Sequence, residues 1–306
     1  MDEKMEMPKV EIAGQPAMSS APNVAPTQAA PVNPLAGYYR QPKVYLQLPS
    51  GGKWYEEGTL DVSEDGRYAV YAMTAKDELM YKTPDALMNG AATTEVIKSC
   101  IPAIKNPWSV LSCDIDAIFI GIKAASGDEA IEVESTCPKK ECGETESYAI
   151  NLQNLLRTIT SGDYSKPYNV GELSVYFSPI NYKEMNAVSL RQFEIQAKYK
   201  DMNLIDDEKE RIEKSQEALV EITSVTMEVL TGAISKIVAP EGQEITEKEY
   251  IIDFLQNCDT KTYEGIRDYN GELRAASTIK SLDMKCAKCE HEYTQPFTLN
   301  ATDFFA

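Results

Sequence analysis

Histidine is almost missing from the sequence, which has one such residue, His291, among 306. This scarcity excludes every site that draws two histidines from one chain, such as the paired histidines of zinc proteases or the two-histidine, one-carboxylate iron site. A Ser-His-Asp or Cys-His catalytic group would have to be built on His291 alone. Carboxylate pairs could also act in catalysis, but among 48 acidic residues no pair stands out as a catalytic site. The sequence therefore predicts a protein that is not an enzyme.

Positive charge is also scarce, because 30 Lys and Arg residues against 48 Asp and Glu residues give a net charge of −18. A nucleic-acid partner is not expected, since neutralising phosphates requires a basic face. No membrane association is expected either: no apolar run approaches the roughly 18 residues of a membrane span, and residues 1–9 lack the apolar stretch of a signal peptide. With 43% apolar residues, the chain can still bury a sizeable core.

Aromatic residues are absent from positions 1–36, a segment that contains six of the 16 prolines and is otherwise rich in Ala, Gln, Ser and Asn. Such a composition buries too little apolar surface to offset the entropy of ordering the chain. We expect a flexible proline- and alanine-rich arm here, which is either a disordered tail or a segment that becomes ordered on a partner.

An α+β domain is predicted from residue 37 to residue 160. Thr74 is expected to begin a helix at 75–80 with Asp77 and Glu78 in its first turn, where carboxylates suit the helix dipole. Alternating apolar residues indicate strands at 44–48, 66–73, 130–135 and 146–150. Helical spacing and terminating residues indicate four further helices: 83–88, 93–101, 114–125 with Ser112 as its cap, and 152–159.

Helical periodicity dominates the next segment, which is predicted to be a mainly helical insertion at 161–280. Residues 171–177 have the pattern of a strand, and two more strands are expected, at 277–284 before Cys286 and at 291–299 after Cys289. The expected helices are 182–200, 204–238, 246–257 and 260–275. The stretch 182–238 has an amphipathic face, which either packs on the protein's own core or docks on another helix.

The seven cysteines are odd in number and occur without an export signal, which favours a reducing compartment and metal ligation over disulfides. Cys137 and Cys142 lie at one predicted turn between two strands, and Cys286 and Cys289 lie at another. Zinc ribbons consist of two such hairpin tips, whose four thiolates enclose one structural zinc ion. Free thiols and a redox dithiol are the alternatives, and His291 could replace one cysteine as a ligand.

Sharing one ion between the two pairs has consequences for the fold. Residues 281–306 would hold the second cysteine hairpin and complete a ribbon with residues 130–150, which brings positions near 150 and near 280 side by side. The predicted fold class is therefore α+β, with short strands, zinc-ribbon-like cysteine hairpins and a helical insertion. The other cysteines lie in helical patterns and are predicted to be small core residues: Cys100, Cys113 and Cys258.

Two adjacent aromatic residues, Trp54 and Tyr55, follow a glycine-containing turn at 50–53. This turn lacks the first glycine of a phosphate-binding loop and the Ser or Thr after its lysine, so a phosphate site is not expected. The aromatic pair is predicted either to anchor the chain in its own core or to contact a partner.

Several segments share their amino-acid motifs, and the order of those motifs, with a known family. They are Leu48–Tyr55 (LPSGGKWY), Met73–Leu79 (MTAKDEL), Pro84–Gly90 (PDALMNG), the helix at Ile97–Cys100, Asp114–Asp116 (DID) and the Cys137–Gly143 hairpin. Together they resemble the T4-type bacteriophage baseplate hub subunit and hub assembly protein family. The sequence departs from that family in its C-x4-C pair, where C-x2-C is more usual, in its proline-rich arm, and at 171–280, where no segment matches.

The resemblance implies a non-enzymatic protein of the contractile tail that acts in the baseplate hub, as a structural hub subunit or as an assembly chaperone for the hub or the tape measure protein. It implies partners among the other baseplate and tail proteins, and a location in the virion tail baseplate, in the host cytoplasm during assembly, or both. The residues leave one alternative, a zinc-ribbon protein associated with nucleic acid or transcription. Its support is four lysines at the hairpin tips: Lys139, Lys140, Lys285 and Lys288.

Overall fold

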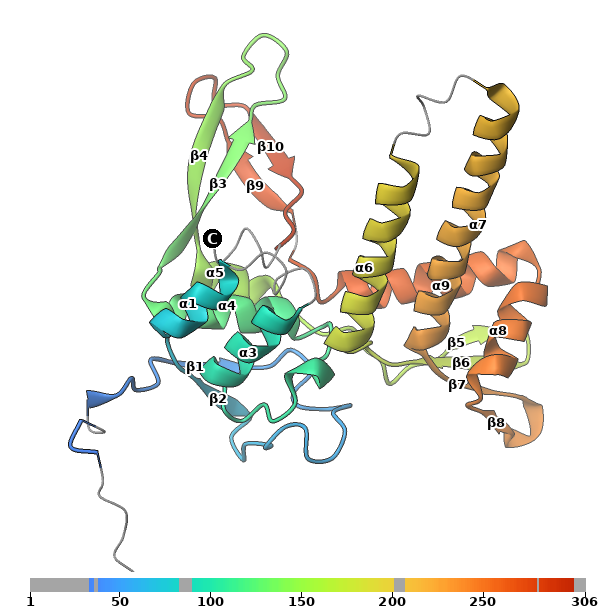
Figure 1. The fold of residues 1–306 in the computed structure, drawn as a ribbon, viewed down its shortest axis with the longest axis horizontal. Coiled ribbons are helices and arrows are strands. Elements are labelled where there is room, and N and C mark those ends of the chain that lie inside the picture. Colours follow the sequence, from blue (N-terminus) through green and yellow to red (C-terminus); the bar gives the residue numbers. More distant parts are fainter. Residues whose placement is uncertain (1–32, 36–37, 83–89, 201–206, 280, 300–306) are drawn as a thin grey trace, which may run out of the picture. The chain divides into compact units, whose positions relative to one another are not determined.

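The computed structural model describes residues 33–35, 38–82, 90–200, 207–279 and 281–299 (Figure 1). The chain divides into a short unit, residues 1–39, and a large unit, residues 40–306. In the short unit the side chain of Asn33 donates a hydrogen bond to the Tyr39 hydroxyl and accepts one from the backbone of Leu35. The helix predicted at 83–88, and all of the predicted arm except residues 33–35, lie outside the described residues.

Helices and small antiparallel sheets make up the large unit, so the predicted α+β class is confirmed. The helices within the described residues are α1 (Ala75–Tyr81), α3 (Ala91–Cys100), α4 (Ile115–Ser126), α5 (Leu152–Thr158), α6 (Tyr182–Tyr199), α7 (Glu208–Ala233), α8 (Lys248–Asn257) and α9 (Thr260–Ala275), with the 3-10 helices η2 (Pro107–Ser109) and η4 (Pro240–Gly242). The strands there are β1 (Val44–Gln47), β2 (Arg67–Val70), β3 (Ala130–Thr136), β4 (Thr145–Asn151), β5 (Tyr168–Val170), β6 (Leu173–Phe177), β7 (Ile234–Val238), β8 (Glu244–Ile245), β9 (Leu282–Lys285) and β10 (Glu292–Gln295). None of these helices combines the length and the apolarity that a membrane span requires.

Helix α4 is the centre of the first hydrophobic core. Its stripe of Ile115, Ile118, Phe119 and Ile122 is buried, together with most of its other side chains. Strands β1 and β2 and helices α3 and α5 contact this helix (Figure 1). Because a fully buried isoleucine contributes roughly 1.5–3 kcal/mol, this region is stabilised by its own packing.

The start of α4 differs from the prediction that Ser112 caps it. The cap residue is Asp114, and the Ser112 backbone N–H instead donates to a carbonyl in the loop between β6 and α6. Asp114 makes no side-chain cap hydrogen bond, because its carboxylate accepts hydrogen bonds from Ser50 and Tyr55. A tertiary network therefore replaces the local cap at this helix.

Helix α1 begins where the sequence predicts. The Thr74 hydroxyl accepts a hydrogen bond from the Asp77 backbone N–H, and the Asp77 carboxylate accepts one from the Thr74 backbone N–H, which completes a capping box. The same carboxylate accepts a hydrogen bond from Ser99 of α3 and lies 3.6 Å from the Arg40 guanidinium. These contacts tie α1 to α3.

The helix predicted at 204–238 is wrong over its last five residues, which form strand β7. This strand pairs antiparallel with β6, with Val175 opposite Ile237, in a sheet of order β5-β6-β7-β8. Ile234, Ile237 and Val238 fit helical spacing, but they are also the β-branched residues that strands favour, so the pattern alone does not separate the two. Pairing with a strand distant in the sequence decides the outcome.

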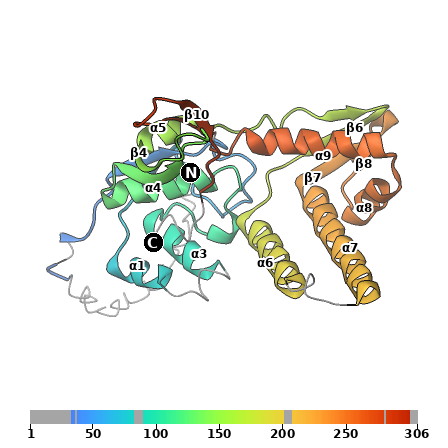
Figure 2. The same cartoon turned by 90° about the horizontal axis from the view of Figure 1, so that it is seen from above.

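Helices α6 and α7 lie side by side as a helical hairpin (Figures 1 and 2). Two ion pairs join them: Arg191 to Glu228 at 2.7 Å and Lys198 to Glu221 at 2.5 Å. The last turns of α7 contribute to a second hydrophobic core with β6, β7, α8 and α9. Between residues 208 and 224, however, Ala218 is the only α7 residue that is buried, so the outer part of this helix faces solvent.

Candidate metal centre

The first cysteine pair lies at the tip of the hairpin formed by β3 and β4. Beyond the last strand pair, the Cys137 N–H donates to the Glu144 carbonyl at 2.8 Å. The N–H groups of Cys142 and Gly143 both donate to the Lys139 carbonyl, at 2.9 and 3.1 Å. Gly143 has a φ of 57°, a left-handed conformation that glycine adopts without steric strain. These bonds fold the tip tightly around its two thiols.

The second pair lies at the tip of the hairpin formed by β9 and β10. The Cys286 N–H donates to the His291 carbonyl at 3.0 Å, and the Glu290 N–H donates to the Cys286 carbonyl at 2.9 Å. Glu290 takes a φ of 54° to close the turn. Both tips thus use backbone hydrogen bonds from a cysteine to place sulfur atoms, as expected from their position between strands.

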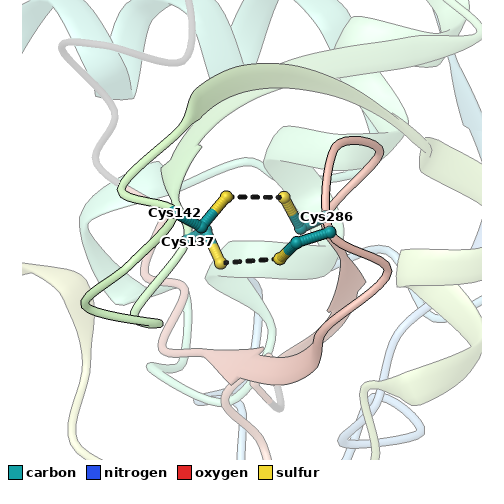
Figure 3. Close-up of side chains that lie close together, drawn as sticks. Cys137, Cys142 and Cys286 are labelled. Atoms are coloured by element: carbon teal, nitrogen blue, oxygen red, sulfur yellow. Dashed lines mark hydrogen bonds between the residues drawn. The ribbon is translucent and has the colours of Figure 1, made fainter.

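The structure brings all four predicted cysteines together, with their sulfur atoms within 4.8 Å of one another. The Sγ atoms of Cys137 and Cys289 are 3.7 Å apart. Those of Cys142 and Cys286 are 3.8 Å apart (Figure 3). Both distances are far longer than a disulfide bond, and all four cysteines are free. A tetrahedral zinc ion with Zn–S bonds of about 2.3 Å requires sulfur atoms about 3.8 Å apart. The four cysteines can therefore hold a metal ion of this size and geometry.

Hydrogen bonds between the two hairpins hold the cysteines in this arrangement. The Ser135 hydroxyl of β3 lies 2.6 Å from the Gln295 side-chain oxygen and 2.8 Å from the Tyr293 hydroxyl, both on β10. The Tyr148 hydroxyl of β4 donates to the Lys285 carbonyl of β9 at 3.2 Å. Segments far apart in the sequence are thereby aligned by contacts that do not involve sulfur.

Burial and hydrogen bonding differ among the four thiols. Cys137 and Cys286 are buried, whereas Cys142 and Cys289 are half-buried. Hydrogen bonds from the backbone N–H groups of Cys289 and Lys288 lower the pKa of the Cys286 thiol, which favours the thiolate that binds metal. Four sulfur ligands fill a tetrahedral shell and leave no position for water or substrate.

His291 lies outside this arrangement. Its side chain is exposed, and its ring stacks on Tyr293 with 6.2 Å between ring centroids. Within the described part of the chain, the group of close metal-binding side chains consists of the four cysteines. Of the remaining cysteines, Cys100 and Cys113 are buried in the core as predicted, whereas Cys258 is only half-buried.

The lysines at the hairpin tips are accompanied by acidic side chains. Lys288 forms an ion pair with Glu144, and Glu146 accepts a hydrogen bond from the Ala287 backbone at 3.0 Å. Lys139 and Lys140 are exposed. The tips therefore present mixed charge, not the basic surface that phosphate binding requires.

Trp54 and Tyr55 point to different environments. Trp54 is 41% exposed, and its ring meets that of Tyr164 edge-on with centroids 5.5 Å apart. The Tyr55 side chain instead packs against the first core, and its hydroxyl donates a hydrogen bond to the carboxylate of Asp114 at 2.8 Å. The turn before them is the predicted glycine turn, with positive φ at Gly51 and Gly52.

Asp114 has a role here that its own segment of the sequence does not indicate. Its carboxylate is fully buried and accepts hydrogen bonds from the Ser50 N–H at 2.8 Å, the Ser50 hydroxyl at 2.6 Å and Tyr55. Burial raises the pKa of this carboxyl above its usual range, although the hydrogen bonds oppose that shift. The signal in the sequence is the shared order of the LPSGGKWY and DID segments, whose residues meet here.

A comparison with protein families gives a match over most of the chain. The family model described as T4 bacteriophage base plate protein matches residues 42–306. The match includes both cysteine hairpins, and also residues 171–280, where no family motif was recognisable in the sequence. The comparison with curated proteins found no match. The comparison with solved structures found none either. Because the family match covers most of the sequence, the chain belongs to the T4 bacteriophage base plate protein family.

Proposed function

We propose that this protein is a non-enzymatic component of the phage baseplate hub, either a structural hub subunit or an assembly chaperone for the hub or tape measure protein. The observation that carries the proposal is the family match over residues 42–306. Family membership supports a place in the tail baseplate and partners among other baseplate proteins. The resemblance of the segments at 48–55, 73–79 and 137–143 to hub proteins supports the narrower assignment.

One structural zinc ion is part of the proposal, held by Cys137, Cys142, Cys286 and Cys289. The complete shell of four thiols supports zinc over a redox dithiol, which requires only two sulfur atoms, and the sulfur spacing of 3.7 and 3.8 Å matches the spacing around a tetrahedral zinc ion. When bound, the ion would link residue 142 to residue 286 and close the intervening segment into a loop. Chain entropy gives such a cross-link on the order of 5 kcal/mol of stabilisation.

The proposed domain organisation follows from that link. Residues 130–150 and 281–306 form one ribbon attached to an α+β domain at 37–160, and residues 161–280 are an insertion within it. The arm at 1–36 and the exposed Trp54 ring are proposed as contacts with other tail proteins. Tyr55 is proposed to assist by orienting its neighbour, since its hydroxyl binds Asp114.

A nucleic-acid or transcription role receives less support. Lys288 is paired with Glu144, and the chain carries a net charge of −18, so salt-dependent attraction to phosphates is not expected. The closed cysteine shell and the single histidine also argue against catalysis.

Deletion of the gene in the phage tests the proposal. We expect normal heads and DNA replication, with tails that fail at the baseplate hub, and rescue by the wild-type gene. Quantitative mass spectrometry of purified virions then distinguishes a hub subunit, which is present at fixed copy number, from a chaperone, which is absent. Blocked late transcription with tails restored by supplied late proteins would contradict the proposal.

A further inference from the structure

A groove of about 500 Å³ lies between α7 and α8 in the large unit. Its lining includes Leu219, Val220 and Met227 of α7 and Ile252 of α8. Leu219 and Val220 are 65% and 69% exposed. A surface that leaves adjacent large apolar side chains in water is suited to association, because burying them against a partner is favourable.

The shape of the groove fits a helix. Leu219, Thr223 and Met227 follow one another at helical turns on α7, and Ile252 and Gln256 do so on α8. Two adjacent helical ridges leave a channel that accepts the ridge of a third helix. Both walls are helical, so they offer no unpaired strand edge with which an extended peptide could pair. Met227 adds a side chain that adapts its shape to an incoming partner.

The charge around the groove is negative. After Lys214, α7 carries acidic but no basic residues. Glu217 lies one turn before Val220, and Glu249 and Asp253 of α8 lie one turn before the groove residues Ile252 and Gln256.

Cations near the groove are already engaged. The ammonium of Lys248 donates to the carbonyls of Thr231, Gly232 and Ile234. Arg191 is paired with Glu228. No cation pairs with Glu217 or Glu249 in the described part of the chain, so both carboxylates are available to a basic partner.

We infer that this groove binds an amphipathic helix from another protein, with apolar residues on one face and Lys or Arg residues along both flanks. The apolar face fits Leu219, Val220 and Met227, and the basic flanks complement Glu217 and Glu249. A second copy of the chain is a poorer occupant, because it would bring one acidic surface against another. The inference goes beyond the proposed hub function, since it assigns a partner chemistry to a surface outside the cysteine cluster.

A peptide-binding measurement on the full-length, metal-loaded protein tests this inference. The probe is a fluorescent helical peptide of about 18 residues, with Leu on one face and Lys along the flanks; a second peptide keeps the Leu face and has Glu in place of Lys. We expect the Lys peptide to bind, the Glu peptide not to bind, and added salt to weaken binding. Leu219→Asp should weaken binding at least about tenfold.

The matched control is Leu79→Asp on α1. Leu79 is also a helical leucine that is 65% exposed, but it does not line the groove. Its substitution should leave binding unchanged, and the double variant Glu217→Gln, Glu249→Gln should reduce both the affinity and its salt dependence.

Unfolding curves verify that each variant remains folded. Three results would overturn the inference: no binding of the Lys peptide, equal loss in both leucine variants, or a wild-type dimer that Leu219→Asp converts to a monomer. The equal loss would indicate general attraction of a cationic peptide to an acidic protein, and the dimer would identify a second copy as the occupant. None of these results depends on the zinc or on the hub assignment.

Discussion

Two helical leucines, Leu155 in α5 and Leu219 in α7, show how differently two regions of the large unit use their apolar residues. Leu155 is 2% exposed and belongs to the core around α4, whereas Leu219 is 65% exposed beside a groove. The core around α4 buries isoleucines and leucines from β1, α3, α4 and α5. The hairpin of α6 and α7 instead leaves several large apolar side chains in contact with water: Phe193, Ile212, Leu219, Val220 and Ile222.

The difference in exposure between these two regions separates residues that stabilise the isolated chain from residues available to a partner. The cysteine hairpins are anchored to the first region, because Ile150 of β4 and Leu282 of β9 pack against the core around α4. The α6–α7 hairpin is joined on its surface by exposed ion pairs, which typically contribute less than about 1 kcal/mol each. We therefore expect substitutions in the first region to affect folding, and substitutions in the second to affect binding.

Loss of one metal ligand should have the largest effect on folding. Cys286→Ser removes one of the four thiols, so we expect zinc to be lost and the free energy of unfolding to fall by more than about 4 kcal/mol. Denaturant unfolding combined with elemental analysis measures both changes. The matched control is Cys258→Ser, at a half-buried cysteine outside the cluster, which should keep its zinc. Equal loss of stability in the two variants would contradict a role for the metal.

The two leucines give the next largest contrast. Leu155→Ala should lower the free energy of unfolding by about 2–5 kcal/mol, because it leaves a cavity in a packed core. Leu219→Ala should change it by no more than about 0.5 kcal/mol, since the side chain already faces solvent. Urea unfolding of both variants measures the difference. A large loss for Leu219→Ala would show that the face of α7 is part of the protein's own core.

A smaller effect, of opposite sign, is expected at Asp116 on α4. Burial raises the pKa of its carboxyl to about 6, and a hydrogen bond with the Ile279 backbone opposes that shift. The folded protein therefore holds this proton more tightly than the unfolded chain, so stability falls as pH rises from about 4 to 6. Above pH 6 the carboxylate costs at most about 2–3 kcal/mol.

Asp116→Asn removes that cost and should make the protein more stable than wild type at pH 8, with nearly equal stability at pH 4. Thermal unfolding of the two proteins at each pH measures the difference, and loss of metal at low pH acts on both alike. An advantage that is the same at pH 4 and pH 8 would rule out the titration of Asp116 as its cause.

Local patterns were sufficient to predict much of the first region. The spacing of Ile115, Ile118 and Ile122 identifies the buried face of α4, and Thr74 identifies the start of α1, because these features depend on residues a few positions apart. The cysteine pairs were also recognisable, since each lies between two alternating strands. Whether the two pairs meet depends on contacts such as Ser135 with Gln295, which no local pattern contains.

The errors occurred where distant pairing decides the structure. Strand β7 has residues that satisfy helical spacing, and its pairing with β6 and β8 makes it a strand. Helical spacing predicts that Asp114 is the first residue of a helix capped by Ser112. In the structure Asp114 is itself the cap residue, and its buried carboxylate accepts hydrogen bonds from Ser50 and Tyr55, more than fifty positions earlier in the chain. Such networks combine residues that are unremarkable in their own segments.

Native mass spectrometry of the full-length protein, purified without added metal, tests whether the four cysteines hold one structural zinc ion. We expect one zinc ion per folded chain, retained in wild type and Cys258→Ser and lost in Cys286→Ser. We also expect that a chelator strong enough to remove the ion shifts the wild-type protein to more highly charged, unfolded forms. A wild-type chain that is folded, free of metal and as stable as the zinc-supplemented protein would contradict a structural zinc site.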